Sequence, residues 1–283
     1  MIYRITGFLL LIETAMLLCC GGVSLLYHED DLISFLQSAS LTALMGLLFI
    51  GRGAEKQLGR RDGYVIVTVA WLAFSLFGML PFYLSGYIPS ITNAFFETMS
   101  GFSSTGATIL NDIEKLPHGL LFWRSMTQWI GGLGIVFFTI AVLPIFGVGG
   151  IQVFAAEASG PTHDKVHPRI GITAKWIWGI YAGLTGTLII LLMFGGMNIF
   201  DSICTSTGGF STKQASIEYY HSPYIEYVIS IFMFISGINF TLLLLFVNGK
   251  LKKFVHDAEL KWYFWSVTGF TIVIAAILYY NSS

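Results

Sequence analysis

Long apolar stretches alternate with short polar segments along the whole chain. A helix needs about 20 apolar residues to cross the roughly 30 Å hydrocarbon core of a bilayer. Seven stretches predict crossings, and they lie at 5–27, 35–50, 64–84, 119–146, 172–195, 222–248 and 261–280. The first is too long for the apolar region of a signal peptide, and no small-residue cleavage site follows it. The pattern predicts an all-α integral membrane protein.

Composition narrows the class further. Only 11% of the 283 residues are charged and 55% are hydrophobic, whereas soluble domains carry about 25% charged residues. A water-soluble enzyme is therefore excluded, and the net charge of -1 gives no global basic surface for nucleic acid. Three cysteines cannot form a disulfide framework. The crossings contain no nucleophile–base pair or metal-ligand cluster, so we expect no enzymatic activity.

The basic residues predict an orientation. With the N-terminus in the cytoplasm, all but three of the fifteen Lys and Arg residues fall on the cytoplasmic side. The exceptions are Lys115, Arg124 and Lys213. Cytoplasmic loops of membrane proteins carry such an excess. We expect seven crossings, with the C-terminus outside.

Two connections between crossings share one order of residues. Segments 91–108 and 198–212 each contain Asn, a Phe, an acidic residue, Ser or Thr, and then Thr-Gly. Each lies between two crossings, which makes a parallel repeat of crossing, half-helix, Thr-Gly loop and crossing. The predicted divisions are an N-terminal transmembrane helix pair (1–60), pore repeat 1 (61–150), pore repeat 2 (151–258) and the first helix of an incomplete repeat 3 (259–283).

The physics of such a repeat favours a cation. Extended backbone at membrane depth is tolerated where protein covers it or where it lines a water-filled path. A half-helix that stops at mid-depth points its negative dipole end inward. Glycine lets the following segment aim its carbonyl groups at a dehydrated ion, as in potassium filters. Two copies cannot close a ring of carbonyls, whereas four can.

Five motifs together resemble the pore subunit of bacterial Trk potassium-uptake systems (TrkH-like), in a superfamily with the Ktr and plant high-affinity carriers. They cover the chain from about residue 60 to 250. The motifs are Phe95-Phe96-Glu97-x-x-Ser100-Gly101-Phe102-x-x-Thr105-Gly106-Ala107-Thr108, Trp129-x-Gly131-Gly132-x-Gly134, Leu143-Pro144-x-x-Gly147-Val148-Gly149-Gly150, Thr207-Gly208-Gly209-Phe210-Ser211-Thr212 and Ile235-Ser236-Gly237-x-Asn239.

The resemblance implies potassium uptake across the bacterial inner membrane through a carbonyl-lined filter, with no cofactor. It also implies a homodimer that binds a cytosolic nucleotide-binding regulatory subunit (TrkA-like). A glycine at the first filter position, here Gly106, goes with potassium preference and a serine with sodium. The implied ion-binding residues, with potassium at Thr105, Gly106, Thr207 and Gly208, are Ser104, Thr105, Gly106, Ala107, Ser206, Thr207, Gly208 and Gly209.

Two departures from the family leave alternatives open. The family's chain has four repeats, so this chain is expected to be C-terminally truncated. The alternatives to potassium uptake are a sodium-selective relative and a non-conducting truncated paralogue that acts only in assembly or regulation. The second pore segment is also short, since Phe95 and Gly106 are 11 residues apart but Phe200 and Gly209 only 9. Coupling to protons or sodium, or simple channel behaviour, stays open.

Several polar residues have a structural and a functional interpretation. For Glu97 and Asp201 we expect helix capping with weak cation attraction rather than ion binding proper, because an acid near a helix N-terminus is stabilised there. We expect Arg124 to snorkel or to bond to loop carbonyls rather than to contact the substrate. Asn239 either lines the pore or ties helices together. Glu13 within the first crossing favours a helix–helix hydrogen bond over a direct functional role. We expect the glycines at 131–134 to allow close helix packing. The histidines at 163–167 are expected to lie in a solvated loop rather than to bind a metal, and the loop 147–171 is a candidate docking surface for a cytosolic partner.

Overall fold

The computed structural model describes residues 2–52, 60–132, 134 and 170–282, and these ranges contain helices and loops without strands. The chain divides into two compact units, Met1–Ile225 and Glu226–Ser283. The predicted all-α fold is therefore confirmed for the described part of the chain.

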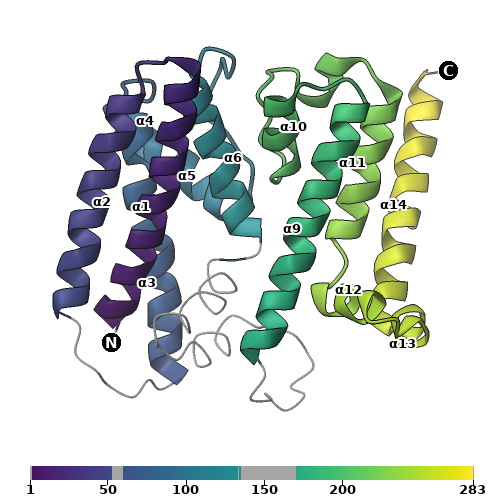
Figure 1. The fold of residues 1–283 in the computed structure, drawn as a ribbon. Helices are drawn as coiled ribbons and strands as arrows, with labels where there is room; N and C mark the ends of the chain where they lie inside the picture. The colour runs from purple at the N-terminus through teal and green to yellow at the C-terminus, as the bar shows by residue number, and fades with distance from the viewer. Residues whose placement is uncertain (1, 53–59, 133, 135–169, 283) are drawn as a thin grey trace. The chain divides into compact units, whose positions relative to one another are not determined.

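The first unit begins with a helical hairpin. Helices α1 (Ile2–Tyr27) and α2 (Leu32–Arg52) run side by side (Figure 1). Their backbones approach closely at Gly7 and Gly46, because a methyl group built on Gly7 would lie 2.6 Å from the Gly46 carbonyl oxygen. Small residues that allow close backbone approach are typical of helix contacts in lipid.

The next helix is interrupted. A single residue, Met79, separates helix α3 (Arg60–Gly78) from α4 (Leu80–Leu84), and Pro81 lies in the first turn of α4. Proline cannot donate to the carbonyl four residues earlier, so a helix breaks or bends there. The indole Nε1 of Trp123 donates to the Gly78 carbonyl at 2.7 Å and holds the break in place.

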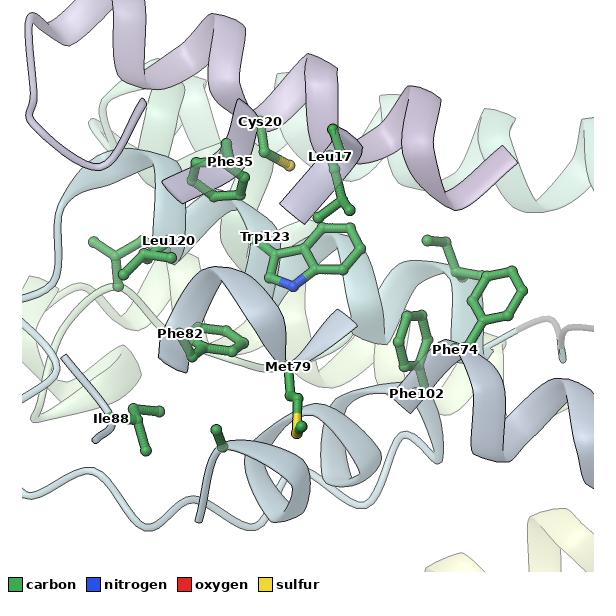
Figure 2. Packing of buried hydrophobic residues seen from close by; sticks show 14 of the residues in the cluster. Leu17, Cys20, Phe35, Phe74, Met79, Phe82, Ile88, Phe102, Leu120 and Trp123 are labelled. Carbon is green, nitrogen blue, oxygen red and sulfur yellow. The ribbon is translucent and has the colours of Figure 1, made fainter. Parts of the chain in front are cut away.

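An aromatic core fixes the first half-helix. Phe102, the last residue of α5 (Ile91–Phe102), packs edge-to-face against Phe74 and Trp123, with ring centroids 5.4 and 6.1 Å apart. Figure 2 shows these rings among Leu17, Cys20, Phe35, Met79, Phe82 and Leu120, all buried. In lipid such contacts stabilise helix packing through van der Waals attraction between closely fitted side chains. The end of α5, where the first loop begins, is therefore anchored.

Helix α6 (His118–Gly132) joins both halves of this unit. Its last turn packs on α5, since a methyl group on Gly131 would collide with the Phe102 carbonyl oxygen. Trp129 donates to Thr185 of α9 (Ile170–Phe194) and accepts from the Tyr181 hydroxyl, at 3.2 and 2.8 Å. The glycines at this position thus permit close packing, in line with the sequence interpretation.

The second half-helix and the end of this unit follow α9. They comprise α10 (Ile199–Ser206), the 3-10 helix η2 (Ser216–Tyr220) and the start of α11 (Pro223–Ser236). A methyl group on Gly195, between α9 and α10, would lie 2.8 Å from Ile225. The first turn of α11 therefore packs against the chain just before α10.

The second unit contains the remainder of α11, then α12 (Phe240–Val247), α13 (Leu251–His256) and α14 (Ala258–Ser282). Between α11 and α12 the chain bends by 100°, so the crossing predicted at 222–248 is broken near its middle. Asn239 explains the bend, because its side chain caps α12 by accepting from the Thr241 amide. A new helix thus begins in a new direction.

The described helices agree with most predicted crossings. Five are long and apolar enough to span a membrane, or six if the bent pair is one span. The crossing expected at 119–146 is described only as far as residue 134. Its remainder, the docking loop at 147–171 and the histidines at 163 and 167 lie outside the described residues, apart from the start of α9.

Candidate functional site

The first Thr-Gly loop folds back on the helix that precedes it. The amides of Thr105 and Gly106 both point to the Ser100 carbonyl oxygen, at 3.0 and 3.4 Å. Ser104 and Gly106 adopt positive φ angles of 54° and 73°. Glycine accepts this conformation without the steric cost that a side chain brings. The amides thus face the helix end, and the loop carbonyls are left for other partners.

The carbonyl groups of this loop divide into two sets. Within the described residues, those of Ser104, Thr105 and Gly106 accept no hydrogen bond, and all three residues are exposed. The Ala107 carbonyl instead accepts from the Ser100 hydroxyl at 2.6 Å. The Ala107 carbonyl thus already accepts one hydrogen bond, whereas the three preceding carbonyls are available to a cation.

A buried carboxylate closes the first loop. Glu97 is 1% exposed and accepts from the Thr108 hydroxyl at 2.9 Å, the Ile109 amide at 3.0 Å and Arg124 Nε at 2.8 Å. These partners satisfy both carboxylate oxygens. The sequence interpretation as a helix cap is corrected, since Glu97 lies within α5 and its partners follow the loop. Its structural role is to fix the chain after the loop to the half-helix.

The second loop is closed by the same device. Asp201 is 4% exposed and accepts from the Thr212 hydroxyl and from the Tyr220 hydroxyl at 2.9 Å. Asp201 and Thr212 are 11 residues apart, as are Glu97 and Thr108. Asn198 caps α10 by accepting from the Asp201 amide, so the predicted N-terminal position of this acid is confirmed. Both loops therefore have an acid–threonine clasp of equal span.

Glycines again release the carbonyls of the second loop. Gly208 and Gly209 have φ angles of 142° and 120°. Thr207 is tied to the helix end, since its amide and hydroxyl both donate to the Cys204 carbonyl. The carbonyls of Ser206, Thr207, Gly208 and Gly209 accept no hydrogen bond from any described residue. All four predicted carbonyls are therefore available.

The two half-helices differ only before their acidic residues. Helix α5 has 12 residues and α10 has 8, yet each continues for five residues after its acid, Glu97 or Asp201. The four missing residues of α10 are thus at its N-terminal end. The shorter Phe-to-Gly spacing found in the sequence does not by itself locate these missing residues, whereas the helix bounds do. The equal acid–threonine span shows that the loop itself is not displaced by a shortened helix.

Arg124 of α6 contacts both loops. Besides Glu97, its guanidinium reaches the Thr108 hydroxyl at 3.3 Å and the Ser211 carbonyl at 3.5 Å. It also stacks over the Phe210 ring, 4.1 Å from the centroid. The planar guanidinium donates in several directions at once, which a lysine cannot do. Bonding to a loop carbonyl agrees with the sequence interpretation of Arg124.

Gln128, one turn further along α6, was missed by the sequence reasoning. Its Oε1 accepts from the Phe210 amide at 2.6 Å, and its backbone carbonyl accepts from the Ser104 hydroxyl at 3.5 Å. Methyl groups built on Gly106 and Gly208 would each lie within 3.3 Å of its side chain. Gln128 therefore lies beside one glycine of each loop, Gly106 and Gly208, whereas a methyl group on Gly209 would meet nothing within 4 Å. The sequence feature that could have identified it is a lone amide side chain within the apolar stretch 119–146.

Further hydrogen bonds join the segments around the two loops. The side-chain oxygen of Gln214 accepts from the Ile113 backbone amide at 3.0 Å, and the backbone amide of Gln214 donates to the Glu114 carboxylate at 3.2 Å. Glu29 accepts from both the backbone amide and the ring Nδ1 of His118, each at 2.7 Å. The start of α6 is thereby tied to the α1–α2 turn, and the two repeats to each other.

Two ionisable groups outside the membrane-spanning helices have shifted pKa values. The pKa of Asp112 is lowered because Lys115 bonds to its carboxylate at 2.8 Å. Burial, followed by the hydrogen bond to Asp201, raises the pKa of Tyr220. Tyr220 therefore keeps its proton at neutral pH and donates it to the clasp.

Asn239 lies apart from the two loops in sequence and belongs to the second unit. Besides capping α12, its amide donates to the Glu259 carboxylate at 3.3 Å, which joins the bend to the start of α14. Of its two sequence interpretations, the structure supports a tie between helices. The described residues contain no group of three His, Cys, Asp or Glu that could hold a metal ion by side-chain coordination.

Apolar spans, two capped half-helices and two loops with free carbonyls define an all-α membrane protein of the class that places half-helices between its spanning helices. The chain belongs to the TrkH family of cation transport proteins, because the model of that family matches residues 32–278. It is 38% identical to the Trk system potassium uptake protein TrkH of Escherichia coli K12, over 99% of this chain and 60% of that protein. Identity to the Trk system potassium uptake protein TrkG of the same organism is 33%, over 94% and 57%.

A solved structure has the same fold. The crystal structure of the potassium transporter TrkH from Vibrio parahaemolyticus superposes with a TM-score of 0.83 at 33% identity. The match covers 100% of this chain and 60% of that one. The chain thus spans about three fifths of the length of the relatives it matches.

Proposed function

We propose that the chain supplies two filter loops to a potassium-uptake pathway of the Trk type. The observation that carries this proposal is the pair of loops with free carbonyls, at Ser104–Gly106 and Ser206–Gly209, held by one helix through Arg124 and Gln128. The names of the matched relatives, which are potassium uptake proteins, support the choice of ion.

In this proposal selection occurs without covalent chemistry. A potassium ion loses its water shell and binds carbonyl oxygens of Thr105, Gly106, Thr207 and Gly208 instead. The acid–threonine clasps hold the loops open, so the carbonyls need no rearrangement when the ion arrives. A closed ring needs four loops, and we assign the other two to parts of the complete transporter outside these two repeats.

The ion preference is assigned to potassium on the basis of Gly106. With φ at 73°, this residue carries no side chain that would compete for space near Gln128. Serine at this position would add a hydroxyl and strain the backbone. We therefore assign the preference to potassium rather than sodium.

The cellular setting belongs to the same proposal. The family is one of membrane cation transporters rather than enzymes. We place the chain in the bacterial inner membrane, with its N-terminus in the cytoplasm, on the asymmetry of Lys and Arg. The proposed assembly is a homodimer with a cytosolic nucleotide-binding, TrkA-like regulatory subunit.

Growth rescue tests the proposed function. The gene's complete reading frame, expressed in a bacterium without its own potassium-uptake systems, should restore growth at low external potassium. A matched frame with Gly106→Val and Gly208→Val, which disturbs the positive φ angles that orient the loop carbonyls, should express in the membrane and fail to rescue. Equal growth with and without the two substitutions would contradict the proposal.

A further inference from the structure

Helix α1 carries a carboxyl group in the middle of its apolar length. Glu13 is 0% exposed, and neither of its carboxyl oxygens has a hydrogen-bond partner among the described residues. The helix–helix hydrogen bond expected from the sequence is therefore absent there. Glu97, a carboxyl group that is buried in α5, has by contrast three kinds of donor around it.

The surroundings of Glu13 connect the helix break to the first half-helix. A methyl group built on Gly78, at the end of α3, would lie 2.9 Å from Glu13 Oε1, 2.9 Å from Thr98 and 3.0 Å from Phe102. Thr98 and Phe102 belong to α5, which leads into the first loop. Glu13 thus lies where α1, the α3–α4 break and the base of α5 meet.

No cation compensates a charge on Glu13 in the described part of the chain. Arg124 of α6 is bonded to Glu97 of α5, and His118 is bonded to Glu29. Arg52 is the last residue of α2, and α3 carries ionisable residues only in its first turns, about 20 Å along the helix from Gly78. The titratable residues of these helices, of α4 and, besides Glu13, of α1 itself are Tyr3, Arg4, Cys19, Cys20, Tyr27, Arg52, Arg60, Arg61, Asp62, Tyr64, Tyr83, Glu97, His118 and Arg124.

A carboxylate without partners is strongly disfavoured in a dry protein interior, and a proton removes the penalty. We propose that Glu13 is a proton-binding site that holds its proton at neutral pH and, in the neutral form, supports the packing of α1 against Gly78 and α5. The neutral group is also a hydrogen-bond donor. The nearby break leaves the Phe77 carbonyl without its usual helical donor, because Pro81 has no N–H.

The site links protonation to the first loop. Loss of the proton would leave a bare negative charge behind Thr98 and Phe102, and the helices would have to separate or admit water to solvate it. The proton site is independent of which cation the loops carry, so spectroscopy can detect it without any transport measurement.

Infrared spectroscopy of the full chain in lipid tests the proton directly. At neutral pH the wild type should show the carbonyl band of a protonated carboxyl group, and Glu13→Gln should remove it. Glu97→Gln is the matched control and should leave the band in place, because Glu97 accepts hydrogen bonds from Arg124 and Thr108. A spectrum of Glu13→Gln identical to that of the wild type would overturn the proposal.

Thermal unfolding against pH gives a second test that uses only a conservative variant. A group that binds its proton more tightly in the folded state loses stability as the pH rises. The wild type should therefore melt at falling temperature between neutral and alkaline pH, and Glu13→Gln should show a smaller fall. Parallel curves for the two proteins would contradict a protonated Glu13.

Discussion

Arg124 and Gln128 lie one turn apart on α6, and both bond to the chain that follows α10, at Ser211 and Phe210. The same two residues contact the first loop, at Thr108 and Ser104. One short stretch of helix therefore sets the spacing of two loops that are about 100 residues apart in sequence.

The buried ion pair between Arg124 and Glu97 predicts a non-additive effect on stability. Removing one partner leaves an uncompensated buried charge, so Arg124→Gln should destabilise the protein by about 3–5 kcal/mol. The double variant Arg124→Gln with Glu97→Gln should lose less than the sum of the two single variants. Unfolding in detergent measures all three, and strictly additive losses would show that the pair is not coupled.

Gln128 is predicted to hold the second loop through one hydrogen bond. Gln128→Leu would leave the buried Phe210 amide without its acceptor, at a cost of about 1–3 kcal/mol. The expected result is a lower melting temperature and weaker potassium binding. Gln37→Leu, on an exposed part of α2, is the matched control and should change neither. An unchanged melting temperature and unchanged potassium binding in Gln128→Leu would show that Gln128 does not support the second loop.

The two acid–threonine clasps predict matched effects in the two repeats. Thr108→Val and Thr212→Val each remove a hydroxyl donor from a buried carboxylate, and each should cost about 1.5–3 kcal/mol, typical of hydrogen bonds to charged groups. Melting temperatures of the two variants and of the exposed Thr187→Val check this expectation. A large loss in only one repeat would show that the clasps are not equivalent.

Asp31 predicts a pH dependence at the α1–α2 turn. Burial, aided by the charge of Glu29, raises the pKa of Asp31. An acid whose folded-state pKa is raised destabilises the fold once it ionises, so the penalty is full above the folded pKa and disappears as the pH falls below the unfolded value. Asp31→Asn should therefore raise the melting temperature at neutral pH and lose this advantage in acid. A constant advantage at every pH would contradict the assignment.

Hydropathy and the order of the motifs predict much of this fold but few of the hydrogen bonds between the two repeats. The spans, the half-helices and both Thr-Gly loops follow from local patterns, because an apolar run of fixed length defines a crossing wherever it packs. The bend at Asn239 does not follow, since hydropathy carries no direction and Ile238 and Phe240 continue the apolar run. The contacts of Gln128 are also tertiary, and a single amide in an apolar helix does not reveal its partner at Phe210.

The potassium-to-sodium permeability ratio of Gly106→Ser, measured in the complete protein, is the sharpest test of the filter assignment. Gly86→Ser is the matched control, because Gly86 has a similar φ of 78° and no neighbour within 4 Å of an added methyl group. Both variants carry the same backbone strain, but only Gly106 lies beside Gln128 in the filter loop. We expect a ratio lowered about tenfold or more for Gly106→Ser, equivalent to roughly 1.4 kcal/mol, and unchanged for Gly86→Ser. An unchanged ratio in both, with potassium flux retained, would contradict the assignment of the filter to this loop.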